Sequence, residues 1–317
     1  MTTVTSRNDA KRIGIVEVGS RAIRLMVADF LWDGSFKALR TGSEMHQVEI
    51  SNLSEHAAAL LWSKVDRFYR ELQSFSCDRA MVYGTALCRK LTGLGYPVPS
   101  YLQILSPEEE GVASWAAGFM CVKGQTEGIK YTAVDQGAGS TEIISAIWTG
   151  TTIAQPSFDT LDIGNSEVME LFNHAPLSYP RSIQERINRY DNSIKKHSAE
   201  VNSRLYLLGS VATKIAWIKV RKGVKDFYKP HLVNDVQLKV SDLYELYGRL
   251  LKIFNENPDK ARSVVDARPE ARDEFARVMS GSVFHMLLAK RMNYSTVRAS
   301  GYGVRHGMAF LVRRELI

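Results

Sequence analysis

The chain has 317 residues, of which 45% are hydrophobic and 24% charged, and its formal net charge is +7. These values lie in the ordinary range for a soluble globular protein and exclude collagen-like, coiled-coil and largely disordered chains. At about 100–200 residues per domain, the length predicts two domains. The cysteines, Cys77, Cys88 and Cys121, form no C-x-x-C pair and predict neither a disulfide framework nor a zinc site.

Positive charge gathers in the second half of the chain. Residues 1–150 carry 15 Lys and Arg against 16 Asp and Glu, whereas residues 151–317 carry 26 against 18. The densest basic run, residues 214–231, indicates either a surface for a polyanion or a solvated lysine-rich helix face. No nucleic-acid recognition motif accompanies this charge, so we expect no nucleic-acid partner.

The N-terminus is polar, and no apolar run approaches the roughly 20 residues that span a bilayer. We therefore expect a cytoplasmic protein with no membrane partner. The sequence leaves open whether the protein forms a homodimer.

The first predicted strand, residues 13–18, ends in an acid and runs into Gly19 and Ser20. An apolar run resumes at residues 23–28, and the turn signal Asp33-Gly34 predicts a third strand near residues 36–41. Ser54 then stands where an N-cap would, ahead of apolar residues at helical spacing. These are Leu60, Leu61, Val65, Phe68, Tyr69 and Leu72.

The same order returns after residue 130. A strand at residues 131–135 ends in an acid, passes through a glycine-rich turn and resumes at residues 141–146. A turn at Thr149-Gly150 predicts a third strand near residues 151–155, and a capping-box pattern predicts a helix start at residues 182–185. The repeat predicts two related α/β domains whose equivalent turns face one another across a cleft.

The turns themselves favour an anion site. Glycine permits positive φ and close approach of the backbone, and successive N–H groups in such a turn form a concavity for anionic oxygens. An acid two residues before the glycine would hold a metal ion or position a water. A single glycine-rich hairpin is commonplace, but two at equivalent places favour a phosphate site.

Residues 134–142, V-D-Q-G-A-G-S-T-E, resemble the D-x-G-G-G-S-T-E signature of the exopolyphosphatase and guanosine pentaphosphate phosphohydrolase family. Other segments resemble the remaining family motifs, in the same order along nearly the whole chain. They are E-V-G-S-R-A-I-R at 17–24, G-T-A-L-C-R at 84–89, I-L-S-P-E-E-E-G at 104–111, G-S-V-A-T at 209–213 and G-Y-G-V-R-H-G at 301–307.

This resemblance implies an α/β fold of two ribonuclease-H-like domains, of the actin and hexokinase type ATPase superfamily, around a central phosphate-binding cleft. The first domain would comprise residues 1–124 with a C-terminal helix at about 302–317. The second would comprise residues 125–301.

The resemblance also implies a catalytic base, which would be Glu110. Its segment, Ser106 followed by Pro107 and acids, equally suits any helix start, with Glu109 as a capping partner. Arg24 and Arg89 match arginines that the family presents to phosphate, although each in isolation would suit a surface ion pair.

Mg²⁺ is the implied cofactor, because carboxylates are the hard oxygen ligands that it takes alongside phosphate oxygens. Its ligands would be Asp135, Glu142 and Glu17, although an acid beside a turn can also bond its own backbone. Substrate phosphates would contact the turns and the arginines. The candidate phosphate-binding residues are Gly19, Ser20, Arg21, Arg24, Arg89, Gly137, Ala138, Gly139, Ser140 and Thr141.

The implied function is a Mg²⁺-dependent hydrolase that releases terminal phosphate from polyphosphate or guanosine pentaphosphate by in-line attack of water. Three departures from the family pattern support an alternative. Glu17 replaces Asp, Arg21-Ala22 replaces Asn-Ser, and Val211-Ala212 replaces Ser-Gly. A degenerate member would bind polyphosphate or guanosine penta- or tetraphosphate as a sensor. A kinase or chaperone-like ATPase of the same superfamily is a third alternative.

Overall fold

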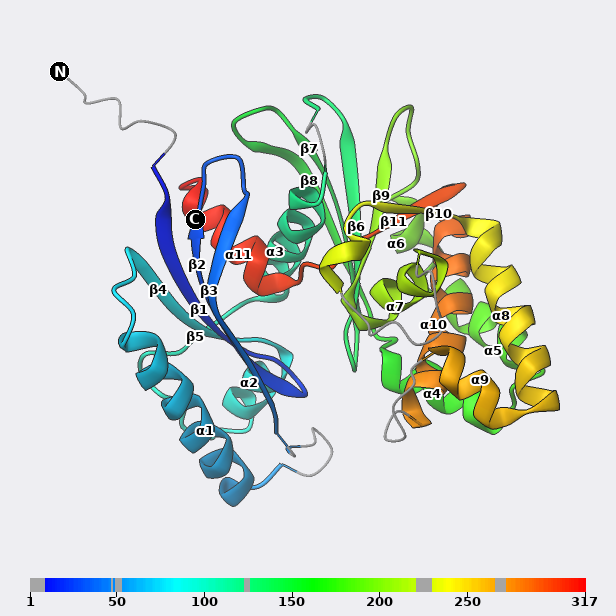
Figure 1. Ribbon diagram of the computed structural model, residues 1–317, viewed down its shortest axis with the longest axis horizontal. Coiled ribbons are helices and arrows are strands. Elements are labelled where there is room, and N and C mark those ends of the chain that lie inside the picture. Colours follow the sequence, from blue (N-terminus) through cyan, green and yellow to red (C-terminus); the bar gives the residue numbers. More distant parts are fainter. Residues whose placement is uncertain (1–8, 47, 49–52, 123–125, 221–229, 266–271) are drawn as a thin grey trace. The chain divides into compact units, whose positions relative to one another are not determined.

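The computed structural model describes residues 9–46, 48, 53–122, 126–220, 230–265 and 272–317. The chain divides into two compact units (Figure 1). Unit 1 comprises Met1–Met120 with Val304–Ile317, and unit 2 comprises Cys121–Gly303. None of the helices in the described ranges is long and apolar enough to cross a membrane.

Unit 1 contains a five-stranded sheet with strand order β3-β2-β1-β4-β5. Its strands are β1 (Lys11–Val18), β2 (Ala22–Phe30), β3 (Phe36–Met45), β4 (Arg79–Gly84) and β5 (Gln103–Ile104). The first three strands form an antiparallel meander, as the apolar runs and the Asp33-Gly34 turn predict. Strand β1 also pairs in parallel with β4, so it lies at the centre of the sheet and is buried over most of its length.

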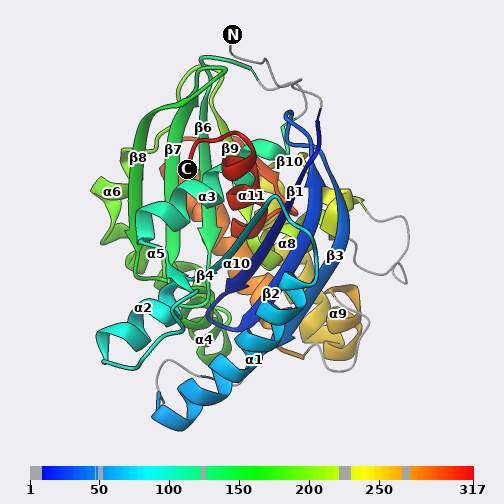
Figure 2. The same ribbon diagram turned by 90° about the vertical axis from the view of Figure 1, so that its left-hand side faces the viewer.

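Helices cover both faces of this sheet (Figure 2). They are α1 (Glu55–Gln73), α2 (Ala86–Gly93), α3 (Pro107–Met120) and α11 (Val304–Arg313). Ser54 caps α1, as predicted, by accepting the Ala57 N–H, and the buried stripe of α1 packs on Val16, Val18 and Leu25. Of the six apolar positions predicted to form that stripe, Leu60 is instead exposed.

Helices α3 and α11 pack against one another through a glycine. A Cβ on Gly307 would lie 1.8 Å from the Ala113 carbonyl oxygen, so only glycine permits this approach. Phe119 and Phe310 meet edge to face beside the crossing, with ring centroids 6.0 Å apart. The final helix is thereby fixed against the first unit.

Unit 2 contains a six-stranded sheet with strand order β10-β11-β9-β6-β7-β8. Its strands are β6 (Lys130–Gln136), β7 (Thr141–Trp148), β8 (Ile153–Leu161), β9 (Arg204–Leu208), β10 (Val236–Lys239) and β11 (Thr296–Ala299). Strand β6 pairs antiparallel with β7 and parallel with β9, as β1 does with β2 and β4. The two sheets therefore share one topology, which agrees with the repeat in the sequence.

The helices of unit 2 bury a large apolar cluster against one face of this sheet. They are α4 (Asn165–His174), α5 (Tyr179–Asn188), α6 (Asp191–Lys195), α7 (Gly209–Val220), α8 (Val240–Glu256), α9 (Pro258–Val265) and α10 (Arg272–Arg291), with a 3-10 turn, η1, at Pro230–Val233. The predicted helix start at Ser182 is wrong. Helix α5 begins at Tyr179 after Ser178, because Pro180 favours the first turn of a helix.

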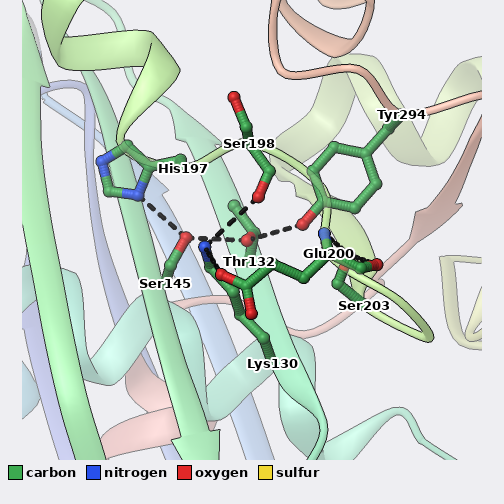
Figure 3. A network of polar contacts seen from close by, with 8 residues as sticks. All are labelled: Lys130, Thr132, Ser145, His197, Ser198, Glu200, Ser203 and Tyr294. Carbon is green, nitrogen blue, oxygen red and sulfur yellow. Dashed lines mark hydrogen bonds and ion pairs between the residues drawn. The ribbon is translucent and has the colours of Figure 1, made fainter.

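A buried polar network crosses the same sheet (Figure 3). The Ser145 hydroxyl lies 2.7 Å from the Thr132 hydroxyl and 2.8 Å from His197 Nδ1, and Thr132 also bonds Tyr294. His197 Nε2 lies 3.2 Å from Asp159, which completes a Ser-His-Asp chain. Ser145 and His197 are 1% and 0% exposed, so no substrate reaches this hydroxyl, and the network serves to join strands to loops.

Two fully buried histidines make unit 2 sensitive to acid. Burial lowers the pKa of His197 and of His285 to about 4. His285 lies in α10, and neither of its ring nitrogens has a hydrogen-bond partner within the described parts of the chain. Because the unfolded chain takes up these protons near pH 6.5 and the folded chain does not, stability falls as the pH drops from about 6.5 toward 4.

We predict that His285→Phe leaves stability equal or higher at pH 7 and removes about 3 kcal/mol of the loss between pH 6.5 and 4. The expected result is a flatter pH profile of the urea unfolding free energy than that of the wild type. His174→Gln, at an exposed position, is the control and should follow the wild-type profile. Parallel profiles for His285→Phe and the wild type would contradict the prediction.

Candidate functional site

The first turn, residues 19–21, joins β1 to β2 at the end of the central strand. The Gly19 N–H donates to the Ala22 carbonyl at 3.0 Å, and the His46 N–H donates to the Arg21 carbonyl at 3.1 Å. His46 Nε2 lies 2.8 Å from the Gly19 carbonyl oxygen. Burial lowers the pKa of His46, so its ring is neutral at pH 7 and braces the turn from the end of β3.

Glu17 lies at the base of the first turn, between two arginines. It faces Arg24 directly across the β1–β2 pair, and Arg24 Nη1 donates to Glu17 Oε1 at 3.0 Å. Arg305, from α11, places Nη1 3.6 Å from Glu17 Oε2. Beside Glu17 on β4, the Tyr83 hydroxyl is buried without a hydrogen-bond partner in the described residues, and burial raises its pKa.

The predicted base, Glu110, lies in the first turn of α3 and pairs with Arg89 of α2. Arg89 Nη1 donates to Glu110 Oε2 at 2.9 Å and to the Leu105 carbonyl at 2.7 Å. Their side chains are 16% and 26% exposed, so solvent reaches the pair. Two candidate residues from separate sequence motifs, one on α2 and one on α3, are thus in contact.

The neighbouring Glu109 has the capping role that the sequence suggested. Its carboxylate accepts the Ser106 N–H at 2.7 Å, while the Ser106 hydroxyl accepts the Glu109 N–H at 3.1 Å. This reciprocal pair fixes the start of α3. Glu110, one residue later, therefore lies in a helix turn whose start is fixed.

The second turn, residues 137–140, joins β6 to β7 and leans on the start of α4. The Gly137 N–H donates to the Ser140 carbonyl at 2.9 Å. The Gly137 and Ala138 carbonyls accept the N–H groups of Asn165 and Ser166, at 2.9 and 3.0 Å. The first N–H groups of α4 thus bind this turn and not an external anion.

The turn residues do not adopt positive φ. Gly19, Gly137, Gly139 and Ala138 all lie outside the left-handed region, so these turns do not use the positive φ that glycine permits. Gly164 is the residue that close packing requires. A Cβ there would lie 2.2 Å from the Ala138 carbonyl oxygen.

The hydroxyls of the second turn bond within unit 2. Ser140 Oγ donates to Glu142 Oε1 at 2.7 Å. Thr141 is fully buried, and its hydroxyl donates to the Ile163 carbonyl at 2.6 Å. Thr141 therefore supports the turn from beneath, and Ser140 orients a carboxylate.

Asp135 and Glu142 are direct cross-strand partners at the base of the second turn. Directly opposed residues of an antiparallel pair have Cβ atoms about 4.5–5.5 Å apart, and like charges at this spacing repel. A cation between them removes the repulsion, and one or two carboxylates with phosphate oxygens and water suit Mg²⁺. This pair fits the metal, whereas Glu17, already paired with two guanidinium groups, does not.

Other sequence features fall outside these turns. Val211 and Ala212 are buried in the apolar cluster of unit 2, so these two side chains contribute to packing of the core. In the basic run, Lys214 pairs with Glu274 and Lys219 with Asp242. Residues 221–229 lie outside the described residues. The described residues contain no cluster of three or more His, Cys, Asp or Glu suited to a metal.

Arg305 and His46 are the site residues that sequence reasoning missed. Arg305 stands within the segment at 301–307 that resembles a family motif, and this was the available signal. His46 follows the third strand with no motif around it. His46 contacts the first turn only because β3 pairs with β2 and ends beside that turn.

Two ribonuclease-H-like units, each with a carboxylate beneath a tight turn, define the two-domain α/β fold of the actin and hexokinase type. The sequence matches the model of the Ppx/GppA phosphatase family over residues 39–314, and the chain belongs to that family. None of the curated proteins matches the sequence.

Solved structures agree with this fold. A Ppx/GppA family member from Aquifex aeolicus has a TM-score of 0.74 at 18% identity, covering 97% of this chain and 99% of that one. An exopolyphosphatase-like protein has a TM-score of 0.69 at 15% identity, covering 98% and 99%. An exopolyphosphatase from Cytophaga hutchinsonii has a TM-score of 0.62 at 14% identity, covering 96% and 98%.

We predict that Gly164→Ala destabilises unit 2 by about 1–3 kcal/mol, because the added methyl group overlaps the backbone of the second turn. Gly139→Ala is the matched control, since a Cβ there meets nothing within 4 Å. It should change stability by less than about 0.5 kcal/mol. Urea unfolding measures both, and equal losses in the two variants would contradict the packing argument.

Proposed function

We propose that this protein is a Mg²⁺-dependent phosphoanhydride hydrolase that releases the terminal phosphate of inorganic polyphosphate or guanosine pentaphosphate. The observation that carries the proposal is the solvent-accessible contact between Glu110 and Arg89, at the positions that the motifs predict. Membership of a phosphatase family supports the same reaction class. The proposal places the protein in the cytoplasm, where both substrates would be met.

In the proposed reaction, Arg89 exchanges its carboxylate partner for a substrate phosphate. In the absence of an anion its guanidinium holds the Glu110 carboxylate. A substrate phosphate competes for that guanidinium, because the planar fork binds phosphate oxygens in a bidentate manner. Glu110 is then left to accept a proton from a water that attacks the terminal phosphorus in line.

Asp135 and Glu142 would hold the Mg²⁺, and Ser140 fixes one Glu142 oxygen. Bound there, the metal would neutralise charge on the phosphate oxygens during transfer. The chain's own contribution is to keep two carboxylates side by side on adjacent strands. Gly137, Ala138 and Gly139 lie in the turn that joins the two strands of this pair.

A sensor that binds the same anions without turnover is the second candidate. The departures at Glu17 and Arg21 favour it, because they alter the first turn and leave cations there. Guanosine penta- or tetraphosphate, or polyphosphate, would be the ligand. This candidate differs from the hydrolase in giving Glu110 no role in proton transfer.

We predict that Glu110→Gln lowers phosphate release from polyphosphate and from guanosine pentaphosphate by about 10²–10⁴-fold, with little change in substrate binding. Gln cannot accept the proton, although it fills the same volume. Release is measured as inorganic phosphate from the purified protein with MgCl₂.

Glu109→Gln is the matched control for this measurement, because glutamine also serves in a capping box. It should keep release within about threefold of the wild type, since it leaves the base in place. No release by the wild type, together with saturable binding of either anion, would reject the hydrolase and leave the sensor.

A further inference from the structure

The two turns have the same topology but opposite charge at their bases. In unit 1 the cross-strand pair is Glu17 with Arg24, whereas in unit 2 it is Asp135 with Glu142. The first pair neutralises itself at 3.0 Å, while the second accumulates negative charge. Equivalent places in the fold therefore attract ions of opposite sign.

Glu17 has both carboxylate oxygens engaged. Oε1 accepts from Arg24 and Oε2 faces Arg305, while the side chain itself is only 9% exposed. A divalent cation at Glu17 would lie beside two guanidinium groups, which would repel it. The residues present at the first turn do not fit Mg²⁺.

The two arginines are more exposed than the carboxylate that they flank. The side chains of Arg24 and Arg305 are 37% and 25% exposed, against 9% for Glu17. Two guanidinium groups with one carboxylate leave a net charge of +1. Burial lowers the pKa of Arg305 and the Glu17 carboxylate opposes that effect, so Glu17 keeps a cation in an otherwise unfavourable place.

Gly19 brings this cluster to the first turn. A Cβ at Gly19 would lie 3.2 Å from Arg24 Nη1 and 3.5 Å from Glu17 Oε1, so the ion pair packs against the backbone of the turn. Each guanidinium has five N–H donors, of which Glu17 uses few. The remaining donors suit a tetrahedral oxyanion, for which arginine forks are well shaped.

We infer that Glu17 is an arginine-positioning residue and not a magnesium ligand. It holds Arg24 and Arg305 as a two-arginine clamp for a phosphate group of the substrate, and Mg²⁺ binds only through Asp135 and Glu142. This inference rests on the proposed function, because it assumes that the substrate is a phosphoanhydride chain. Arg305, on α11, is thereby a phosphate-binding residue beside the first turn.

The test separates metal binding from anion binding by titration calorimetry on the full chain. MgCl₂ alone is titrated in one series, and tripolyphosphate in the presence of EDTA in the other. The variants are Glu17→Gln, Arg305→Met, Arg305→Lys and Asp135→Asn. Arg12→Met is the matched control, since Arg12 pairs with Asp29 at 2.9 Å across the same two strands, away from the turn.

We predict that Glu17→Gln and Arg305→Met weaken tripolyphosphate binding about tenfold or more and leave Mg²⁺ affinity within twofold. Arg305→Lys should show an intermediate loss, because it keeps the charge without the fork. Asp135→Asn should lose Mg²⁺ affinity about tenfold or more and keep metal-free tripolyphosphate binding. Arg12→Met should match the wild type in both series. Thermal unfolding of each variant verifies that it is folded.

Two results would overturn the inference. Loss of Mg²⁺ affinity in Glu17→Gln would make Glu17 a metal ligand, and unchanged tripolyphosphate affinity in both Glu17→Gln and Arg305→Met would remove the clamp. A wild type that binds no tripolyphosphate, with or without Mg²⁺, would reject the proposed function and the clamp together. The MgCl₂ series would still decide the role of Glu17.

Discussion

Strand register at the base of each turn is the constraint on which the chemistry of this protein depends. In both units an antiparallel hairpin starts from the central strand, so the last acid of that strand faces a fixed residue of the next. Arg24 is the partner in unit 1 and Glu142 in unit 2. Since directly opposed side chains interact strongly, one position carries an ion pair and the other carries two adjacent carboxylates, which we propose as the cation site. A single fold thus provides two electrostatic environments from one arrangement of strands.

Both turns are held from outside rather than by their own conformation. The first is braced by His46 at the end of β3, and the second by the start of α4 through Gly164. These braces use backbone carbonyls that would otherwise lie unbonded near solvent. Rigid support of this kind keeps the carboxylates at the base of each turn in fixed positions. A shift of about 1 Å in a turn would move their oxygens as far as the addition of one methylene group does.

The repeat, the fold class and the family could be predicted from the sequence, because apolar runs, turn residues and ordered motifs are all local signals. Local caps were predicted well where the cap and its partner lie within one turn, as at Ser54 and Glu109. The start of α5 was missed because the capping-box pattern at Ser182 resembles a helix start more closely than Ser178 and Pro180 do. Arg305 could not be placed, since its contact with Glu17 depends on α11 packing against α3 at a depth that Gly307 alone permits.

The altered first motif need not mean a lost activity. Glutamate in place of aspartate adds a methylene, which carries the carboxylate farther from its strand and toward Arg305 on α11, where the separation is 3.6 Å. An aspartate at the same position would retract from that guanidinium while remaining close to its strand neighbours. The longer acid therefore suits a residue that bonds arginine. In the proposed hydrolase, Glu110 with Arg89 would serve proton transfer, and Asp135 with Glu142 would hold the metal. In that proposal, the changes at the first turn affect how tightly a phosphate is held, and the groups assigned to the chemical step lie at other positions.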